Sequence, residues 1–88
     1  MRARLPAVTS IDVSGQVHAI LSARQRGVEL RPEMSLGSGG LGLDSIALVE
    51  VLLECEDRFG VSIAAEMLEQ PSLTVGLLVE RIEALVPP

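Results

Sequence analysis

Ser45 is the side chain whose type and setting best suit chemistry in this sequence. It belongs to the run LGLDSI at residues 41–46, between a glycine-rich stretch and an acidic segment with helical periodicity. A hydroxyl in the first turn of a helix is accessible, and the helix dipole favours a phosphate group beside it. The sequence offers no local base, so a second protein would have to supply the chemistry. This setting favours phosphate attachment, while the simpler interpretation is that Asp44 or Ser45 only caps the helix.

The glycine-rich run GSGGLG at residues 37–42 has the spacing G-x-G-x-x-G of dinucleotide-binding loops. Such a loop needs a preceding strand and a βαβ unit, and the sequence indicates neither. The run is not a Walker A loop, because Leu43 and Asp44 stand where lysine and serine or threonine are required. We therefore predict that these glycines are turn residues.

His18 and Cys55 are the one histidine and the one cysteine of the chain. A hydrolase could combine His18 with Ser45, but the sequence around Ser45 is not G-x-S-x-G and no strand is predicted to build a nucleophile elbow. We assign His18 to a surface or boundary position. Cys55 falls on the apolar face of its predicted helix, so we expect a small buried hydrophobe. A multi-cysteine metal site is excluded.

The composition indicates one small globular domain. The 88 residues are 48% apolar and 22% charged, with a net charge of −5. A chain of this length has little room for a deep, water-excluded catalytic cavity. The acidic balance disfavours nucleic acid as a partner and favours proteins with basic surfaces. No apolar segment follows the first residues and no run reaches membrane-spanning length, so we expect a protein of the reducing cytoplasm.

Four stretches have the apolar periodicity of helices, and none alternates like a strand. The first is predicted over about residues 11–26, with Thr9 or Ser10 as its cap, Asp12 in its first turn and Gly27 at its end. The others are predicted from Asp44–Ser45 to Phe59–Gly60, from about Ala64 to Gln70, and from Ser72 or Thr74 to the final prolines. These stretches predict an all-α fold, a small four-helix bundle with three main helices and one short helix.

A long connection, residues 28–44, separates the first two predicted helices. It is rich in glycine, but it also carries apolar side chains that a flexible linker would lack. We predict that it crosses the core and is held there by Leu36 and Leu41. The chain is therefore expected to form one domain over residues 1–88, with an ordered core over 11–86 and a flexible segment at 1–8.

The predicted second helix has more apolar surface than one core needs. A helical wheel assigns to the core face Leu48, Val51, Leu52, Cys55 and Phe59. A second stripe starts at Ser45 and continues through Val49, Leu53 and Glu56. The side opposite the core carries Glu50, Glu54, Asp57 and Arg58. We expect Val49 and Leu53 to be exposed beside Ser45, where apolar side chains can serve a partner protein.

At these residues the sequence resembles the acyl carrier protein family, the phosphopantetheine-bearing carriers of fatty acid and polyketide synthesis. The run at residues 41–46 is similar to the family's L-G-x-D-S-L, and the acidic segment that ends near Phe59 is similar to the family's second helix. Residues 63–69 and 74–79 resemble its third and fourth helices. The resemblance covers roughly residues 11–86.

The resemblance implies that Ser45 is the attachment point of 4′-phosphopantetheine, which a separate phosphopantetheinyl transferase takes from coenzyme A. Asp44 would help to position Ser45 and to bind the metal-bearing site of that enzyme. The thiol of the arm would hold an acyl group as a thioester. The chain would then be a discrete carrier, usually a monomer in this family, and not itself an enzyme.

The resemblance also makes the second helix the surface that recognises partner enzymes. Its acidic side chains would meet basic docking patches on acyl-transferring and condensing enzymes. The positions predicted to face these partners are Val49, Glu50, Leu53, Glu54, Glu56 and Asp57. The simpler interpretation of the acidic positions is a solvated helix face.

The sequence departs from the family pattern near Ser45. Ile46 replaces the usual leucine, and Ala47 stands where many members carry an acid. These departures leave a specialised pathway open. A peptidyl or aminoacyl carrier would use the same serine, although Leu43 speaks against its G-G-x-S pattern. A third interpretation is a non-covalent helical interaction module in which Asp44 and Ser45 form only a cap.

Overall fold

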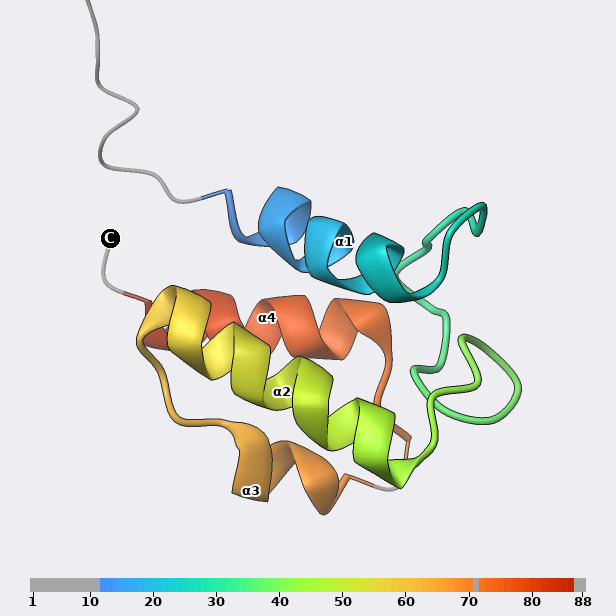
Figure 1. Cartoon of the computed structure of the whole chain (residues 1–88). Helices are drawn as coiled ribbons and strands as arrows, with labels where there is room; N and C mark the ends of the chain where they lie inside the picture. Colours follow the sequence, from blue (N-terminus) through green and yellow to red (C-terminus); the bar gives the residue numbers. More distant parts are fainter. Residues whose placement is uncertain (1–11, 71, 87–88) are drawn as a thin grey trace, which may run out of the picture.

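The computed structural model describes residues 12–70 and 72–86 and folds them into four helices. As Figure 1 shows, these are α1 (Val13–Arg24), α2 (Ser45–Phe59), α3 (Ala64–Leu68) and α4 (Val75–Leu85). The described ranges contain no strand, and one isolated bridge joins Ser35 to Thr74. The predicted all-α bundle is therefore confirmed. The segment predicted to be flexible, residues 1–8, lies outside the described residues.

The first helix begins later than its sequence pattern predicted. Asp12 is its N-cap, because the Oδ1 atom of Asp12 accepts a hydrogen bond of 3.0 Å from the backbone N–H of Gly15. The prediction that Asp12 lies inside the first turn, after a cap at Thr9 or Ser10, is therefore wrong, and those two residues lie outside the described ones. The helix also ends before Gly27, which has φ +78° in the turn that follows.

Local side-chain and backbone features mark the ends of α2 and α3 and the start of α4. α2 stops at Gly60, whose φ of +68° is the left-handed conformation that closes a helix. α3 is shorter than predicted, with its C-cap at Glu69. α4 begins after Thr74, because the Oγ1 atom of Thr74 accepts a hydrogen bond of 3.1 Å from the N–H of Leu77. Of the two predicted caps, Thr74 is thus confirmed and Ser72 is not.

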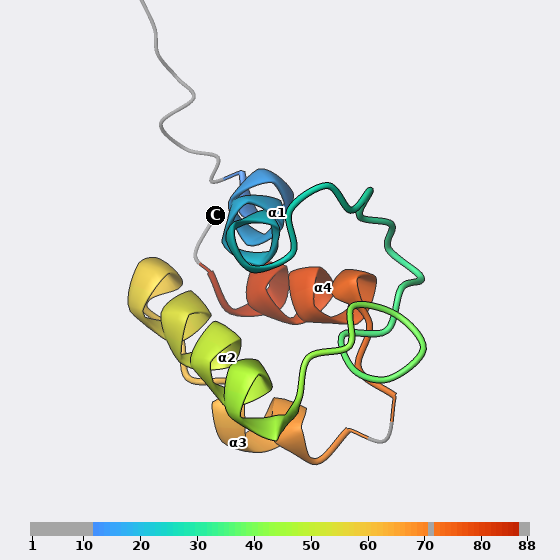
Figure 2. The ribbon, with the colours of Figure 1, turned by 45° about the vertical axis from the view of Figure 1, so that its right-hand side comes forward.

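A single hydrophobic core lies between the helices. α1 packs against both α2 and α4, and α3 packs against α2 (Figures 1 and 2). The buried core residues are Val13, Val17, Ile20, Leu21, Leu36, Leu41, Leu43, Val51, Leu52, Cys55, Ile63, Met67, Leu73, Val75, Leu78 and Ile82. No polar or charged side chain is buried among the residues that the structure describes. The predicted anchoring of the long connection by Leu36 and Leu41 is confirmed.

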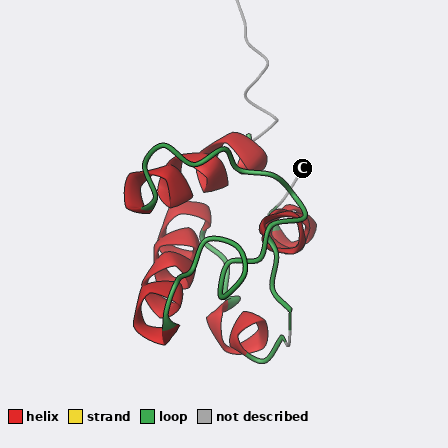
Figure 3. Cartoon of the chain, turned by 90° about the vertical axis from the view of Figure 1, so that its right-hand side faces the viewer, coloured by secondary structure: helices red, strands yellow, loops and turns green. Residues whose placement is uncertain are grey.

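The connection between α1 and α2 is a closed loop that belongs to the fold (Figure 3). Its two sides are joined by hydrogen bonds from the N–H of Leu41 to the carbonyl of Ser35, 2.8 Å, and from the N–H of Leu43 to the carbonyl of Leu36, 3.0 Å. The N–H of Val75, at the start of α4, also donates to a loop carbonyl, that of Met34, at 2.9 Å. The loop is therefore fixed to α4 before it enters α2.

The glycines of this loop are turn residues, as predicted. Gly39 and Gly42 have φ of +87° and +71°, a conformation that L side chains rarely adopt. Gly40 is required for a different reason, because a Cβ atom there would collide with the backbone carbonyl of Ser35. The dinucleotide-like spacing of the run therefore follows from the geometry of a tight loop.

Candidate functional site

The start of α2 presents Ser45 to solvent while Asp44 caps the helix. The Oδ1 atom of Asp44 accepts a hydrogen bond of 2.8 Å from the N–H of Ala47, and its backbone carbonyl accepts one of 2.8 Å from Leu48. Ser45 is the first residue of α2 and is exposed. Its hydroxyl has no hydrogen-bond partner among residues 12–70 and 72–86. Of the two residues that could cap the helix, Asp44 does so and leaves the hydroxyl of Ser45 available.

The loop leucines hold this exposed serine at a fixed place. Leu41 and Leu43 are buried on either side of Gly42, so the chain that leads into α2 is attached to the core. The side-chain amide of Gln25, just after α1, donates a hydrogen bond of 2.8 Å to the carbonyl of Leu41. The site thus combines a side chain in water with a backbone that is packed and hydrogen-bonded.

A groove runs beside the first turn of α2. It has a volume of about 470 Å³ and lies between the loop, α2 and the segment that follows α3. The residues that line it are Ser35, Leu36, Gly37, Ser38, Leu48, Gln70, Ser72 and Leu73. Leu48 is half-buried and follows Ser45 by less than one helical turn. A group attached at Ser45 would therefore find both apolar and polar walls close to its point of attachment.

α2 has exposed apolar side chains, as the wheel indicated, but not all of them are the ones that were predicted. Leu53 is 50% exposed, as expected, whereas Val49 is only half-exposed. Ile46 is the most exposed large apolar side chain of the described residues, at 70%, and was not among the predicted partner-facing positions. It lies on the same helical face as Val49 and Leu53, at a spacing that the wheel could have revealed.

Three of the four acidic positions predicted to face partners have intramolecular contacts. Glu50 pairs with Arg24 of α1 at 2.9 Å, and Glu54 lies 3.9 Å from Arg58. The Oε2 atom of Glu56 accepts two hydrogen bonds, each 2.7 Å long, from the backbone N–H groups of residues 63 and 64. These two donors lower the pKa of the Glu56 carboxyl. Asp57 is exposed.

The two residues that could have formed a nucleophilic site do not meet Ser45. Cys55 is fully buried in the core, as predicted, and this burial raises the pKa of its thiol to about 11, with a smaller contribution from the charge of Glu54. His18 is half-buried on α1, where it lines a groove with α4 residues that include Val75. No hydrogen bond joins it to Ser45 in the described part of the chain. The hydrolase interpretation therefore has no geometric support.

The comparison with known families decides what kind of protein this is. A family model described as the phosphopantetheine attachment site matches residues 23–82, more than half of the chain. The chain belongs to this family. Phosphopantetheine carrier domains hold a covalently attached 4′-phosphopantetheine and are not enzymes themselves. Neither the search of curated proteins nor that of solved structures found a match.

Two further observations describe this carrier protein. Within residues 12–70 and 72–86, no group of three or more His, Cys, Asp and Glu side chains is placed to hold a metal ion. No helix in that same part is long and apolar enough to cross a membrane.

Carrier proteins interact with a phosphopantetheinyl transferase and with the enzymes of their pathway, so the surface around the attachment site must be accessible to large partners.

Replacing Asp44 with alanine is expected to lower the free energy of unfolding by about 1 kcal/mol, because the N–H of Ala47 loses its acceptor. Asp44→Asn should lower the free energy of unfolding much less, since the asparagine carbonyl can accept the same hydrogen bond. Urea unfolding of the three proteins measures both values. Equal losses for the two variants would show that the charge of Asp44, and not its hydrogen bond, stabilises α2.

Proposed function

We propose that this chain is a discrete acyl carrier protein whose phosphopantetheine arm is attached to Ser45. The observation that carries this proposal is an exposed hydroxyl at the first residue of a long, capped helix. The other serines inside the matched residues lie in loops and turns: Ser35, Ser38, Ser62 and Ser72. Ser45 is therefore the serine of the matched region whose position suits an anionic attachment.

The geometry at Ser45 fits a phosphodiester. The backbone N–H groups of Ser45 and Ile46 have no acceptor among the described residues, and they point along a helix whose dipole is positive at this end. A phosphate on the hydroxyl of Ser45 would lie near both groups. The groove of about 470 Å³ beside Leu48 leaves room for the rest of the arm.

Attachment forms a bond between the Ser45 oxygen and the phosphorus that bears the pantetheine, as the pyrophosphate bond of coenzyme A breaks and adenosine 3′,5′-bisphosphate leaves. The chain supplies the nucleophile, but it does not supply the base that removes the hydroxyl proton. Asp44 is the adjacent ionisable side chain, and its Oδ1 atom already holds the N–H of Ala47. The transferase must therefore provide the base. Once attached, the group contributes a thiol that carries an acyl chain as a thioester.

Partner enzymes would dock on α2 beside Ser45. Ile46 and Leu53 provide exposed apolar area there, with Val49 between them. Glu50, Glu54 and Asp57 add negative charge that basic patches of acyl-transferring and condensing enzymes can match, because the exposed intramolecular pairs of Glu50 and Glu54 are weak and exchangeable. Glu56 is left out of this surface, since its carboxylate caps α3.

Incubating the apo protein with coenzyme A and a broad-specificity transferase should add the mass of one phosphopantetheinyl group. A thiol reagent provides a second measurement, because buried Cys55, with a pKa of about 11, has almost no thiolate at neutral pH. The native protein should show no fast-reacting thiol before modification and one afterwards. A folded protein that gains no mass would refute the proposal.

The cargo is tested by a second step on the modified protein. Acyl-transferring enzymes of fatty acid or polyketide synthesis should load the new thiol, and adenylating enzymes that activate amino acids should not. The reverse pattern would identify a peptidyl or aminoacyl carrier.

A further inference from the structure

α3 is too short to be stable without help from its neighbours. It has five residues, and Ile63 at its N-cap offers no side-chain acceptor for the first amides. An isolated helix of this length does not persist in water. The apolar side chains that attach this segment to the core are Ile63 and Met67, 1% and 2% exposed. The position of α3 must therefore depend on contacts from other elements.

The first such contact comes from the last turn of α2. The Oε2 atom of Glu56 accepts hydrogen bonds of 2.7 Å from the N–H of Ile63 and from the N–H of Ala64. The N–H of Ala64 is one of the first amides of α3, which have no acceptor inside the helix, and the N–H of Ile63 comes directly before it. Hydrogen bonds to an ionised carboxylate are stronger than neutral ones. Glu56 thus acts as the cap that the sequence of α3 itself lacks.

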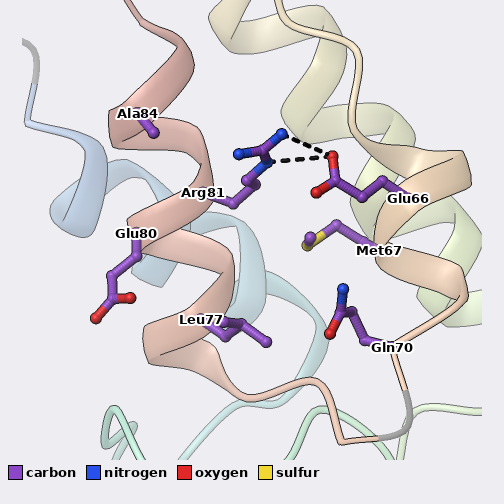
Figure 4. A pocket seen from close by; sticks show the side chains of 7 residues that line it. All are labelled: Glu66, Met67, Gln70, Leu77, Glu80, Arg81 and Ala84. Carbon is purple, nitrogen blue, oxygen red and sulfur yellow. Dashed lines mark hydrogen bonds and ion pairs between the residues drawn. The ribbon is translucent and has the colours of Figure 1, made fainter.

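The second contact joins α3 to α4. The Nε and Nη2 atoms of Arg81 lie 3.1 Å and 3.0 Å from the Oε1 atom of Glu66, as the dashed lines in Figure 4 show. This pair spans one end of a groove of about 230 Å³ between the two helices, with Met67 and Leu77 along its walls. Both side chains are about 40% exposed or more, so the pair is a weak tie.

We propose that Glu56 is a positioning residue for α3. When the hydrogen bonds from Ile63 and Ala64 to Glu56 are lost, α3 opens as a separate unit. α1 packs directly against both α2 and α4, so these three helices have contacts with one another that do not involve α3. Opening would withdraw Met67 from the core and widen the groove between α3 and α4. The Glu66–Arg81 pair would then be the remaining ion pair between α3 and α4 and would limit how far α3 moves.

Native-state amide hydrogen exchange tests this proposal. The probes are three amides that donate to backbone carbonyls of this segment: Met67 in α3, Glu69 at its C-cap and Gln70 just after it. In Glu56→Ala, their exchange should become about tenfold faster. Amides inside α1, α2 and α4 should keep their wild-type rates. Glu56→Gln should give a smaller acceleration, because glutamine keeps a neutral acceptor.

Glu54→Ala is the matched control, since Glu54 lies on the same helix and is exposed with only a long contact to Arg58. It should leave the α3 amides unchanged. Arg81→Gln, which removes the second tie, should accelerate them less than Glu56→Ala. Equal acceleration in all four helices would show that Glu56 supports the whole fold and would overturn the proposal. Unchanged exchange of α3 in Glu56→Ala would overturn it as well.

Discussion

A Ser45→Ala variant is expected to fold like the wild type and to gain no phosphopantetheine under conditions that modify the wild type completely. The fold should survive because Ser45 is exposed and the cap of α2 is provided by Asp44. The free energy of unfolding should therefore change by less than about 0.5 kcal/mol. The loss of modification should be complete, because removing the oxygen removes the atom that is esterified. Intact-mass measurement and a urea titration of the same sample give both results.

Ser38→Ala is the control for this variant. Ser38 is also exposed and also lies within the matched residues, but it occupies a turn of the loop. This variant should be modified at the wild-type rate. If Ser45→Ala still gained one group while Ser38→Ala did not, the attachment point would lie in the loop, and the functional assignment of α2 would have to be abandoned.

Replacing Gly40 with alanine is expected to destabilise the protein by about 2 kcal/mol or more. A Cβ atom at Gly40 would collide with the backbone oxygen of Ser35 and would lie 2.7 Å from its nitrogen. Ser35 cannot move away easily, because its carbonyl accepts a hydrogen bond from Leu41 and it forms the bridge to Thr74. The strain is expected to loosen the loop that fixes the start of α2. Chemical unfolding measures the loss directly.

Gly37→Ala provides the comparison, since the nearest atom to a Cβ there would be the carbonyl oxygen of Leu43 at 3.9 Å. This variant should change the free energy of unfolding by less than about 1 kcal/mol, in either direction. If both variants lowered the free energy of unfolding by the same amount, the close approach of Gly40 to Ser35 would not be what the loop requires.

The sequence was sufficient where local chemistry decides the structure. α2 could be delimited because Asp44 is a good cap and Gly60 a good terminator, and the structure uses both. The burial of Leu36 and Leu41 was predictable because a solvated linker has no use for such side chains. The start of α1 was not, because Thr9, Ser10 and Asp12 all offer capping side chains and the sequence does not choose among them, whereas the structure uses Asp12.

The sequence could not assign the roles of the acidic side chains on α2. A helical wheel shows which positions share a face, but it does not show which donors arrive from elsewhere in the chain. Glu56 meets the amides of Ile63 and Ala64 only because the chain reverses after Gly60. Glu50 meets Arg24 only because α1 packs against α2. These contacts are tertiary, so they leave no periodic signal.

The attachment of phosphopantetheine to Ser45 is tested most directly by fragmenting the modified protein in a mass spectrometer and locating the added group. We expect every fragment that contains Ser45 to carry the group and every fragment that lacks it to have its unmodified mass. A group found on another serine or threonine, or a folded protein that accepts none, would contradict the assignment of Ser45 as the attachment point.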